Sequence, residues 1–484
     1  MNILTTCLEA GLGPVLATAP SNGASDLLAI KFFYHVQSLG PKYRGLLDRA
    51  VRYTSTVELT SQLRPRQEKP LGNESDSEDE APPDSNQEKR EISELDLLLE
   101  LEETIGRVPR ELTMNYKRQQ LDPTWDQQLD KYLNKEMDQG EQDAFHRLRD
   151  KLDNMILSKI DIVFTTCSSA GSHELSKYPA TVVLVDEAGQ GSEPETLIPL
   201  TTCYLSMKIA IFIGGHLQLP PFNINKIAIL KVSMIHRLVK LHEKGISGVK
   251  VATLRNNYRS IAPIVHYTSA QFYSNRLIPT ITERALFWDK LWAASFGTTA
   301  SIVWVNCDGL DKRLPTNSVQ NYENAETIVR ILKLLEKNST TLGYQLEKHH
   351  VGVVTMYKGQ TETVEQLVEG QIGEGLEGLT ISNVDSFQGR ERPIIIVDLV
   401  RSNTSRAIGF LRKEGRINVA FSRAQYKTIV IGDVGMYAMS PLFDSVPCPS
   451  LFNLASEAKT GRIKCEGVVP HCHHDIKLIE SASL

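Results

Sequence analysis

Two adjacent carboxylates follow a short apolar run near the middle of the chain. Four apolar residues end at Val185 and lead directly into Asp186 and Glu187. Two carboxylates at the end of a buried strand are costly unless they bind a cation or face a charged partner. One carboxylate of such a pair could hold Mg²⁺ on a nucleotide while its neighbour orients a water molecule. An ordinary structural pair is an equally good interpretation of these two residues taken alone.

Three further stretches carry side chains suited to binding a phosphate or a base. Gln218 follows a glycine turn at the end of another apolar run, where it could sense a γ-phosphate. Tyr258 could stack on a base, and the guanidinium of the next residue, Arg259, could hold phosphate. Arg416 and Arg423 are seven residues apart, which would place both on one face of a helix. Each of these motifs, taken singly, is more often ordinary surface.

Short apolar runs separated by helical patterns must position these side chains. The runs cover residues 15–19, 160–165, 181–185, 209–213, 351–355, 394–399 and 428–431. Continuous apolar strands that alternate with helices predict parallel sheets covered on both faces, and therefore an α/β fold. In such sheets, ligand-binding residues gather just past the carboxyl ends of the strands. The carboxylate pair and Gln218 lie at such places.

The charge of the chain is distributed unevenly. The 484 residues, enough for two or three domains, carry a formal net charge of −5. Residues 74–103 hold thirteen acidic residues against Lys89 and Arg90, a net charge of −11 that leaves the other residues at +6. The segment from residue 66 to about 94 is almost free of aromatic and β-branched residues, so we expect an acidic disordered loop there.

Composition excludes several classes of protein. No apolar run approaches the ~18–20 residues needed to span a bilayer, and the N-terminus does not follow the pattern of a signal peptide. Seven scattered cysteines do not make a disulfide framework, so we expect a protein of the cytoplasm or nucleus with no membrane partner. The group Cys465, His471, Cys472, His473 and His474 fits no common zinc spacing. We therefore expect residues 441–484 to form a solvated tail.

Taken in order, the polar motifs resemble those of the superfamily 1 helicases, closest to the 1B branch that includes the nonsense-mediated-decay helicase. In the first half of the chain, Ala19 to Asn22 resembles motif Ia, Thr165 to Cys167 resembles the next strand-end motif, Asp186 to Ala188 resembles motif II, and Gln218 to Pro221 resembles the tail of motif III. In the second half, Asn257 to Arg259 resembles the start of the linker into the second motor domain, Val384 to Glu391 resembles motif V, and Arg416 to Ala424 resembles motif VI. The resemblance runs from about Pro14 to Asp433 and is interrupted by the acidic segment.

The resemblance implies two RecA-like domains of the P-loop NTPase type, with ATP and Mg²⁺ held between them. The first would comprise residues 1–39 and 158–250, and the second residues 251–440. Residues 40–157 would be an insert in the first domain, with the acidic loop 66–94 followed by helices such as 125–133 and 145–156.

By the same resemblance, Asp186 would coordinate Mg²⁺, and Glu187 would polarise the attacking water. Gln218 would read the γ-phosphate, while Arg259 and Arg423 would act as arginine fingers that stabilise charge in the transition state.

Further residues would bind the nucleotide and a single strand of nucleic acid. Tyr258 would stack on the base, and Gln388, Gly389 and Glu391 would contact the nucleotide. The residues expected to touch the nucleic-acid backbone are Ser21, Asn22, Thr165, Pro220, Thr355 and Ser386. Such contacts are mainly electrostatic and tolerant of sequence, which suits a body with a net charge of +6.

The sequence departs from the family pattern in two places. The phosphate-binding loop needs a Gly-Lys pair, and no Gly-Lys dipeptide occurs among these 484 residues. Only about eighteen residues precede Ala19, so we expect the chain to begin just past this loop, and a central position of the first sheet to be empty. Gly215 stands where motif III usually carries an aspartate.

Two functions therefore stay open. The first is an ATP-dependent helicase or translocase on single-stranded nucleic acid, with RNA favoured over DNA. The second is a degenerate helicase that binds nucleic acid or a protein partner without hydrolysing ATP. The retention of Glu187, Arg259, Gln388, Glu391 and Arg423 as a set favours the first. We expect the acidic insert to repel stray nucleic acid or to dock a basic partner.

Overall fold

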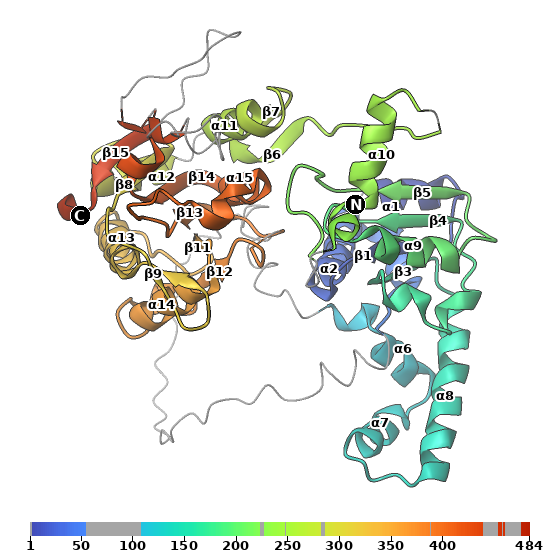
Figure 1. Cartoon of the computed structure of the whole chain (residues 1–484). Coiled ribbons are helices and arrows are strands. Elements are labelled where there is room, and N and C mark those ends of the chain that lie inside the picture. The colour runs from blue at the N-terminus through green and yellow to red at the C-terminus, as the bar shows by residue number, and fades with distance from the viewer. Residues whose placement is uncertain are drawn as a thin grey trace, which may run out of the picture. The chain divides into compact units, whose positions relative to one another are not determined.

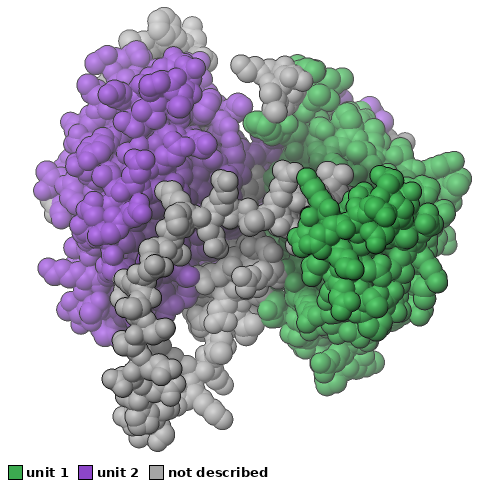
Figure 2. Space-filling view, turned by 90° about the horizontal axis from the view of Figure 1, so that it is seen from below, with its two compact units in different colours: residues 1–215, 221–243 green, residues 216–220, 244–484 purple. Residues whose placement is uncertain are grey.

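The computed structural model describes residues 2–54, 108–222, 227–246, 248–281, 286–387, 389–438, 454–456, 458–459 and 476–484. The chain divides into two compact units, which Figure 2 distinguishes by colour. Unit 1 comprises residues 1–215 and 221–243, and unit 2 comprises residues 216–220 and 244–484. Each unit is built on one large parallel sheet, which confirms the predicted α/β class.

Unit 1 contains a five-stranded parallel sheet with the order β2-β3-β1-β4-β5 (Figure 1). Its strands are β1 (Val15–Ala19), β2 (Ala50–Arg52), β3 (Ile162–Thr166), β4 (Val182–Val185) and β5 (Ile209–Phe212). β1, β3 and β4 are buried along their whole length, as expected for strands covered on both faces. Because all five strands are parallel, their carboxyl ends lie along one edge of the sheet.

Helices cover both faces of this sheet. α1 (Asn2–Glu9), α2 (Asn22–Ser38) and α3 (Gly45–Asp48) pack on one face, and α8 (Gln139–Leu157) and α9 (Glu193–Thr202) contribute to the core on the other. Successive residues of β1 alternate between the two cores, since Val15 and Ala17 join the first and Leu16 joins the second. α10 (Met234–Glu243) follows β5 along the chain.

The helical part of the predicted insert forms a small core of its own. It contains α6 (Met114–Leu121), α7 (Trp125–Leu133) and α8, so the helix expected at 125–133 is confirmed and that at 145–156 lies within α8. Trp125 stacks on Phe145 with 5.2 Å between ring centroids. A buried ion pair joins α6 to α8, with 2.7 Å between Arg118 Nε and Asp153 Oδ1.

Two expectations for unit 1 are wrong. No central position is empty, because the five described strands pair without a gap and the half-exposed strand, β5, lies at an edge. A gap would leave the backbone groups of two buried strands unpaired, whereas an edge exposes only one such row. The predicted insert also starts too early, since β2 pairs in parallel with β3 and belongs to the sheet.

Unit 2 contains a six-stranded parallel sheet with the order β12-β11-β13-β14-β8-β15. Its strands are β8 (Ile302–Asn306), β11 (Val351–Thr355), β12 (Thr380–Asn383), β13 (Arg392–Asp398), β14 (Ala424–Gly432) and β15 (Ile476–Glu480). Two small pairs accompany this sheet: β6 (Asn256–Ile261) lies parallel to β7 (Ile278–Ile281), and β9 (Lys312–Arg313) lies antiparallel to β10 (Val319–Gln320).

Two apolar cores lie on opposite faces of the second sheet. α11 (Ala262–Phe272), α15 (Glu414–Phe421) and α16 (Val434–Tyr437) contribute to one core, and α12 (Leu286–Phe296), α13 (Tyr322–Thr341) and α14 (Lys358–Val368) contribute to the other. In β8, Trp304 joins the first core, and Val303 and Val305 join the second. This covering of both faces explains the continuous apolar runs of the sequence.

The C-terminal residues correct a further expectation. β15 pairs in parallel with β8, so the last residues of the chain extend the second sheet and are not a solvated tail. Its apolar residues are only partly buried, with Ile476 and Leu478 packing against one core and Ile479 against the other, as expected for an edge strand. The acidic loop 66–94 and the cysteine and histidine group at 465–474 lie outside the described residues. Among the helices that are described, none is both long and apolar enough to cross a membrane.

Candidate functional site

The carboxylate pair lies at the carboxyl edge of the first sheet. Asp186 directly follows β4, and its N–H donates to the Thr18 carbonyl of β1 at 2.8 Å, which continues the sheet pairing by one residue. Glu187 then adopts a φ of 48° and turns the chain away from the sheet. The Gln190 Nε2 donates to Glu187 Oε2 at 2.9 Å and orients this carboxylate. The sequence prediction of a paired-carboxylate strand end is therefore matched by the backbone.

Burial raises the pKa of Asp186 to about 6, and the charge of the neighbouring Glu187 adds to the effect. A bound cation would offset both causes, so this carboxylate suits a hard divalent ion such as Mg²⁺. Within the described ranges, no group of three or more His, Cys, Asp or Glu side chains is arranged to hold a metal ion. A magnesium ion at Asp186 would therefore complete its coordination with water and substrate phosphate, as is usual for Mg²⁺.

The turns after β4 and β5 pack backbone against backbone. A Cβ atom on Gly189 would lie 2.7 Å from the Gly215 carbonyl oxygen, and one on Gly214 would lie 2.9 Å from the Ala188 nitrogen. The Ala188 N–H also donates to the Ile213 carbonyl at 2.8 Å. These contacts leave no room for side chains at Gly189 and Gly214, and they fix the turn that carries the carboxylates relative to the end of β5.

The first turn of α2 presents two of the expected nucleic-acid contacts. Ser21 is exposed and caps the helix, with its Oγ accepting from the Ala24 N–H at 3.2 Å. The Oδ1 of half-buried Asn22 accepts from Arg52 at 3.1 Å, and Arg52 Nε donates to Asp26 at 2.6 Å. Sequence reasoning missed Arg52, although an arginine inside a short buried strand is itself a signal of a specific partner.

Two other expected nucleic-acid contacts have buried side chains. Thr165 is fully buried within β3, and its hydroxyl has no hydrogen-bond partner in the described part of the chain. Thr355 is also fully buried, and its hydroxyl lies 2.7 Å from that of Thr361. Both strands are covered on both faces, so a position at the strand end does not bring these side chains to the surface. Pro220 and Ser386 are exposed and remain predictions.

In unit 2, the strand register brings motifs V and VI together. Arg392 opens β13 and lies opposite Ala424, which opens β14, and the Arg392 N–H donates to the Arg423 carbonyl at 3.1 Å at the amino edge of this sheet. Arg259, from β6, forms an ion pair with Glu391 and donates to the Ser422 carbonyl at 3.1 Å. These two side chains stay partly accessible, 30% for Arg259 and 22% for Glu391.

The aromatic residue expected to stack on a base is accessible. Tyr258 is 73% exposed, and its hydroxyl accepts from Asn256 Nδ2 at 3.3 Å. Side chains alternate along β6, so Tyr258 and Arg259 point to opposite sides of the strand. Gly389 adopts a φ of 87°, a conformation that favours glycine. Gln388 lies outside the described residues.

The expected helical face with two arginines is wrong. α15 ends at Phe421, and Arg423 lies beyond it, where its Nε donates back to the Val419 carbonyl at 3.0 Å. This bond satisfies a carbonyl of the last helical turn, which is a common way to end a helix. Arg423 is almost fully buried, whereas Arg416 stays on α15 and forms an ion pair with Asp385 at 2.8 Å.

Residues 216–220, which include Gln218, pack with unit 2. Asn418 Nδ2 donates to the Leu217 carbonyl at 3.1 Å. A side chain at Gly415, in the first turn of α15, would collide with the backbone carbonyl of Gln218. Sequence reasoning missed Gly415 and Asn418, because nothing in a helix-forming segment shows which of its residues another backbone segment touches.

Comparison with known families agrees with this division of the chain. Residues 9–226 match one family model described as an AAA domain, and residues 230–435 match a second model with the same description. Together the two models span the strands of both sheets except β15.

Individual relatives are similar over about two thirds of the chain. Regulator of nonsense transcripts 1 of Caenorhabditis elegans is 30% identical over 306 residues, which are 62% of this chain and 27% of that protein. An ATP-dependent helicase of Saccharomyces cerevisiae is 30% identical over 316 residues, 64% of this chain and 31% of the yeast protein. An uncharacterised ATP-dependent helicase of Methanocaldococcus jannaschii is 28% identical over 308 residues, 62% of this chain and 43% of its own length. The chain thus spans less than half of each relative.

Proposed function

Because this chain belongs to the superfamily 1 helicases, with regions similar to the nonsense-transcript regulators, we propose that it is an ATP-dependent helicase or translocase on single-stranded nucleic acid. The observation that supports this most is the ion pair between Arg259 and Glu391, formed where the backbone of motif VI lies beside motif V at the amino edge of the second sheet. Groups that would serve nucleotide binding come from three separate motifs, and the register of β13 and β14 draws them together.

In the proposed reaction, each of these side chains has one task. Mg²⁺, when bound, would neutralise charge on the nucleotide phosphates. Asp186 would hold this ion through a carboxylate oxygen, and Glu187 would orient the attacking water. Arg259 and Arg423 would donate to the charge that develops on the transferred phosphoryl group. Gln218 would sense the γ-phosphate, and the ring of Tyr258 would stack on the base.

The nucleic acid would be held through its backbone, with RNA favoured over DNA because the relatives include regulators of nonsense transcripts. Exposed Ser21, Pro220 and Ser386 and half-buried Asn22 are the proposed contacts. Contacts of this kind are largely electrostatic, and the chain outside residues 74–103 carries a net charge of +6. For a protein with these partners we propose a cytoplasmic or nuclear location.

A second candidate function is nucleic-acid or protein binding without ATP hydrolysis. One observation favours it: Gly215 stands where motif III usually has an aspartate. A phosphate-binding loop contributes several charged hydrogen bonds worth about 1.5–3 kcal/mol each, so ATP turnover by the natural protein depends on whether it carries such a loop.

One experiment separates the two candidates. The natural protein is purified through a C-terminal tag, which retains any residues ahead of Met1, and is compared with the 484-residue chain. Binding to single-stranded RNA and DNA is measured across a salt series, together with ATP turnover. The proposed function predicts RNA-stimulated turnover by the tagged natural protein. Binding without turnover would support the second candidate, and no binding to either nucleic acid at low salt would contradict both nucleic-acid functions.

The acidic segment suggests an additional role. Residues 74–103 carry a net charge of −11 and interrupt the first domain between the strands β2 and β3. We propose that this segment repels nucleic acid bound at the wrong place or docks a basic protein partner. Both roles follow from charge alone and need no ordered structure.

A further inference from the structure

The loop between β13 and α15, residues 399–413, begins with a strained turn. The Arg401 N–H donates to the Leu399 carbonyl at 2.7 Å, which closes a three-residue turn around Val400. Val400 has a φ of 66°, an unfavourable conformation for a β-branched residue. Its N–H donates to Asp398 at 2.9 Å, and its carbonyl accepts from Asn321 at 3.1 Å. Strain of this kind persists only where the surroundings fix it, and it is concentrated at binding sites.

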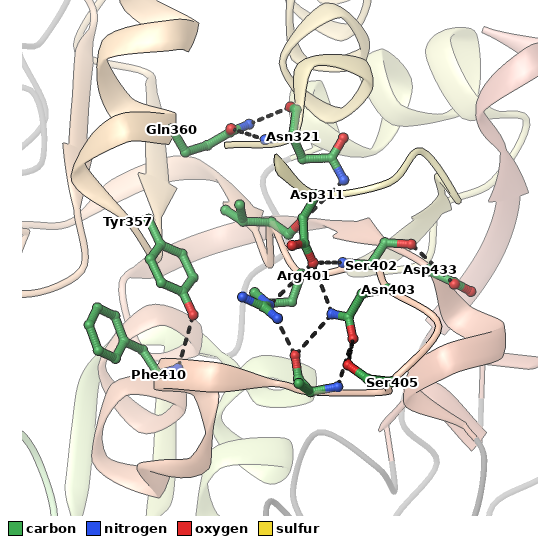
Figure 3. A network of polar contacts seen from close by, with 12 residues as sticks. Asp311, Asn321, Tyr357, Gln360, Arg401, Ser402, Asn403, Ser405, Phe410 and Asp433 are labelled. Carbon is green, nitrogen blue, oxygen red and sulfur yellow. Dashed lines mark hydrogen bonds and ion pairs between the residues drawn. The ribbon is translucent and has the colours of Figure 1, made fainter. Parts of the chain in front are cut away.

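Asp311, from the segment between β8 and β9, holds the start of this loop. Figure 3 shows its carboxylate at the centre of a polar network that joins three successive loop residues. Asp311 Oδ2 accepts from the Ser402 N–H at 2.9 Å and from Asn403 Nδ2 at 2.9 Å, and it lies 3.2 Å from Arg401 Nε. The carboxylate therefore neutralises Arg401 and fixes the direction in which the loop leaves the sheet.

Asn403 shapes the exposed tip of the loop. Its Oδ1 accepts from the Ala407 N–H at 2.9 Å and from the Ser405 hydroxyl at 2.7 Å. Residues 404–406 are exposed, and Arg406 has a φ of 55°, so the tip is a tight turn closed by a side chain. The guanidinium of Arg406 thus extends from a fixed backbone.

The return of the loop is anchored at Phe410. Its N–H donates to the Tyr357 hydroxyl at 3.0 Å, and the two rings stack with 4.8 Å between centroids. Arg416 lies 4.8 Å from the centroid of Phe410 and forms an ion pair with Asp385. Because Asp385 precedes exposed Ser386, the same contacts connect this loop to a proposed nucleic-acid contact.

We propose that the loop of residues 399–413 contacts the backbone of single-stranded nucleic acid, with Arg406 and Arg412 as phosphate contacts and Asp311 as a positioning residue. The loop follows the carboxyl end of β13, the edge of a parallel sheet where ligands bind. Arg406 and Arg412 are exposed, and the described part of the chain shows no ion pair to either. Guanidinium groups bind phosphate through paired hydrogen bonds. This inference rests on the proposed function and deepens it.

The effect of Asp311 distinguishes positioning from simple charge. Asp311→Asn removes a negative charge near a polyanion, so electrostatics alone predicts tighter binding of RNA. Positioning predicts weaker binding, because the loop loses the carboxylate that holds Arg401 and Asn403. Asp308→Asn is the matched control: it removes the same charge from an exposed side chain three residues away, and the described residues make no side-chain hydrogen bond or ion pair with Asp308.

Affinity for fluorescein-labelled oligouridylate is measured by anisotropy across a salt series. We expect D311N to bind several-fold more weakly than D308N, and D308N to bind as tightly as the unchanged chain or slightly tighter. The exposed variant R406Q/R412Q should bind about tenfold more weakly or worse, and its dependence of log affinity on log salt should flatten by about 1.4. K290Q/K337Q, which removes two exposed charges from α12 and α13, should change the RNA affinity and its salt dependence less than R406Q/R412Q does.

The outcomes separate this inference from the proposed function. Suppose that the unchanged chain binds RNA, that D311N has the same RNA affinity as D308N, and that R406Q/R412Q has the same RNA affinity as K290Q/K337Q. The loop is then not a contact, and the proposed function still stands. If the unchanged chain binds neither RNA nor DNA, the proposed function and this inference both fail. Thermal melts check whether D311N folds. If it does not, the RNA affinity of the surface variant R406Q/R412Q tests the proposed contact instead.

Discussion

Arg259 forms an ion pair with Glu391, although the family pattern expects both side chains to bind nucleotide. Without a ligand, the guanidinium and the carboxylate are each other's partners. Gln425 Nε2 also donates to Glu391 at 3.2 Å, so the carboxylate has a second donor when Arg259 leaves it. If a phosphate replaced Glu391 as the partner of Arg259, the Glu391 carboxylate would therefore still accept a hydrogen bond from Gln425. Under the proposed function, Arg259 would exchange the Glu391 carboxylate for a phosphate of the nucleotide.

Arg259→Met tests that role. A transition-state arginine contributes about 10³–10⁵ in turnover number, so we expect RNA-stimulated ATPase of the C-terminally tagged natural protein to fall by about three orders of magnitude. Because both partners are partly exposed, stability should change by less than about 1 kcal/mol. ATPase rates and urea unfolding check the two parts. Parent-like turnover in R259M would remove Arg259 from the chemistry.

Asp186→Asn tests the proposed cation site through stability. The pKa of Asp186 is raised from 3.8 to about 6, so the folded chain keeps this proton to a higher pH than the unfolded chain does. The contribution of protonated Asp186 to the free energy of unfolding is therefore complete below about pH 4. It decreases as the pH rises to about 6 and is lost above that pH. We expect D186N to be more stable than the parent at pH 7.5, by about 3 kcal/mol at most, with the difference vanishing near pH 4.

Mg²⁺ provides the control for this measurement. An ion bound by Asp186 stabilises the charged carboxylate, so Mg²⁺ should raise the stability of the parent at pH 7.5 and leave D186N unchanged. Urea unfolding at both pH values, with and without Mg²⁺, supplies all the comparisons. Equal stabilisation of parent and variant by Mg²⁺ would place the ion elsewhere.

Arg52 and Asn22 should act as one unit in nucleic-acid binding. Arg52→Lys keeps the charge but loses the fork that reaches both Asn22 and Asp26. We expect R52K and N22A each to weaken binding of single-stranded RNA, and the double variant to be no weaker than the worse single one. The double-mutant cycle should give a coupling of about 1 kcal/mol. Additive effects would mean that Arg52 does not position Asn22.

The acidic segment should limit nonspecific binding. Replacing residues 74–103 with a neutral Gly-Ser linker of equal length removes a net charge of −11 without shortening the chain. We expect tighter RNA binding at low salt and a smaller difference at high salt, because screening weakens long-range repulsion. A variant with the same thirty residues in shuffled order should behave like the parent if charge alone matters. If the neutral variant binds RNA with unchanged affinity, repulsion is ruled out. If the shuffled variant no longer captures a basic partner that the parent captures, the segment docks that partner specifically.

The sequence predicts the central strands well because burial on both faces leaves a simple signal. β1 and β11 match the expected runs at 15–19 and 351–355, since every residue of each strand is buried. β2 and β15 were missed, because an edge strand of three to five residues needs no long apolar run.

Site residues are predicted less well than strands, because a motif position does not specify where a side chain points. Thr165 and Thr355 occupy strand ends and are nevertheless buried. Arg423 lies outside α15 because the helix ends at Phe421. The register of β13 and β14, which places motif V beside motif VI, depends on contacts between distant segments that no local pattern encodes.

The most direct test of the proposed function is ATP turnover by the C-terminally tagged natural protein and its Glu187→Gln variant, each with and without single-stranded RNA. Glutamine keeps the shape of the side chain but is a much weaker acceptor for a proton of the attacking water. We predict that RNA stimulates hydrolysis by the parent and that E187Q binds RNA with the same affinity but loses at least about a hundredfold in turnover. Equal turnover by the two proteins, or none by the parent under conditions in which it binds RNA, would contradict the proposal of an ATP-driven motor.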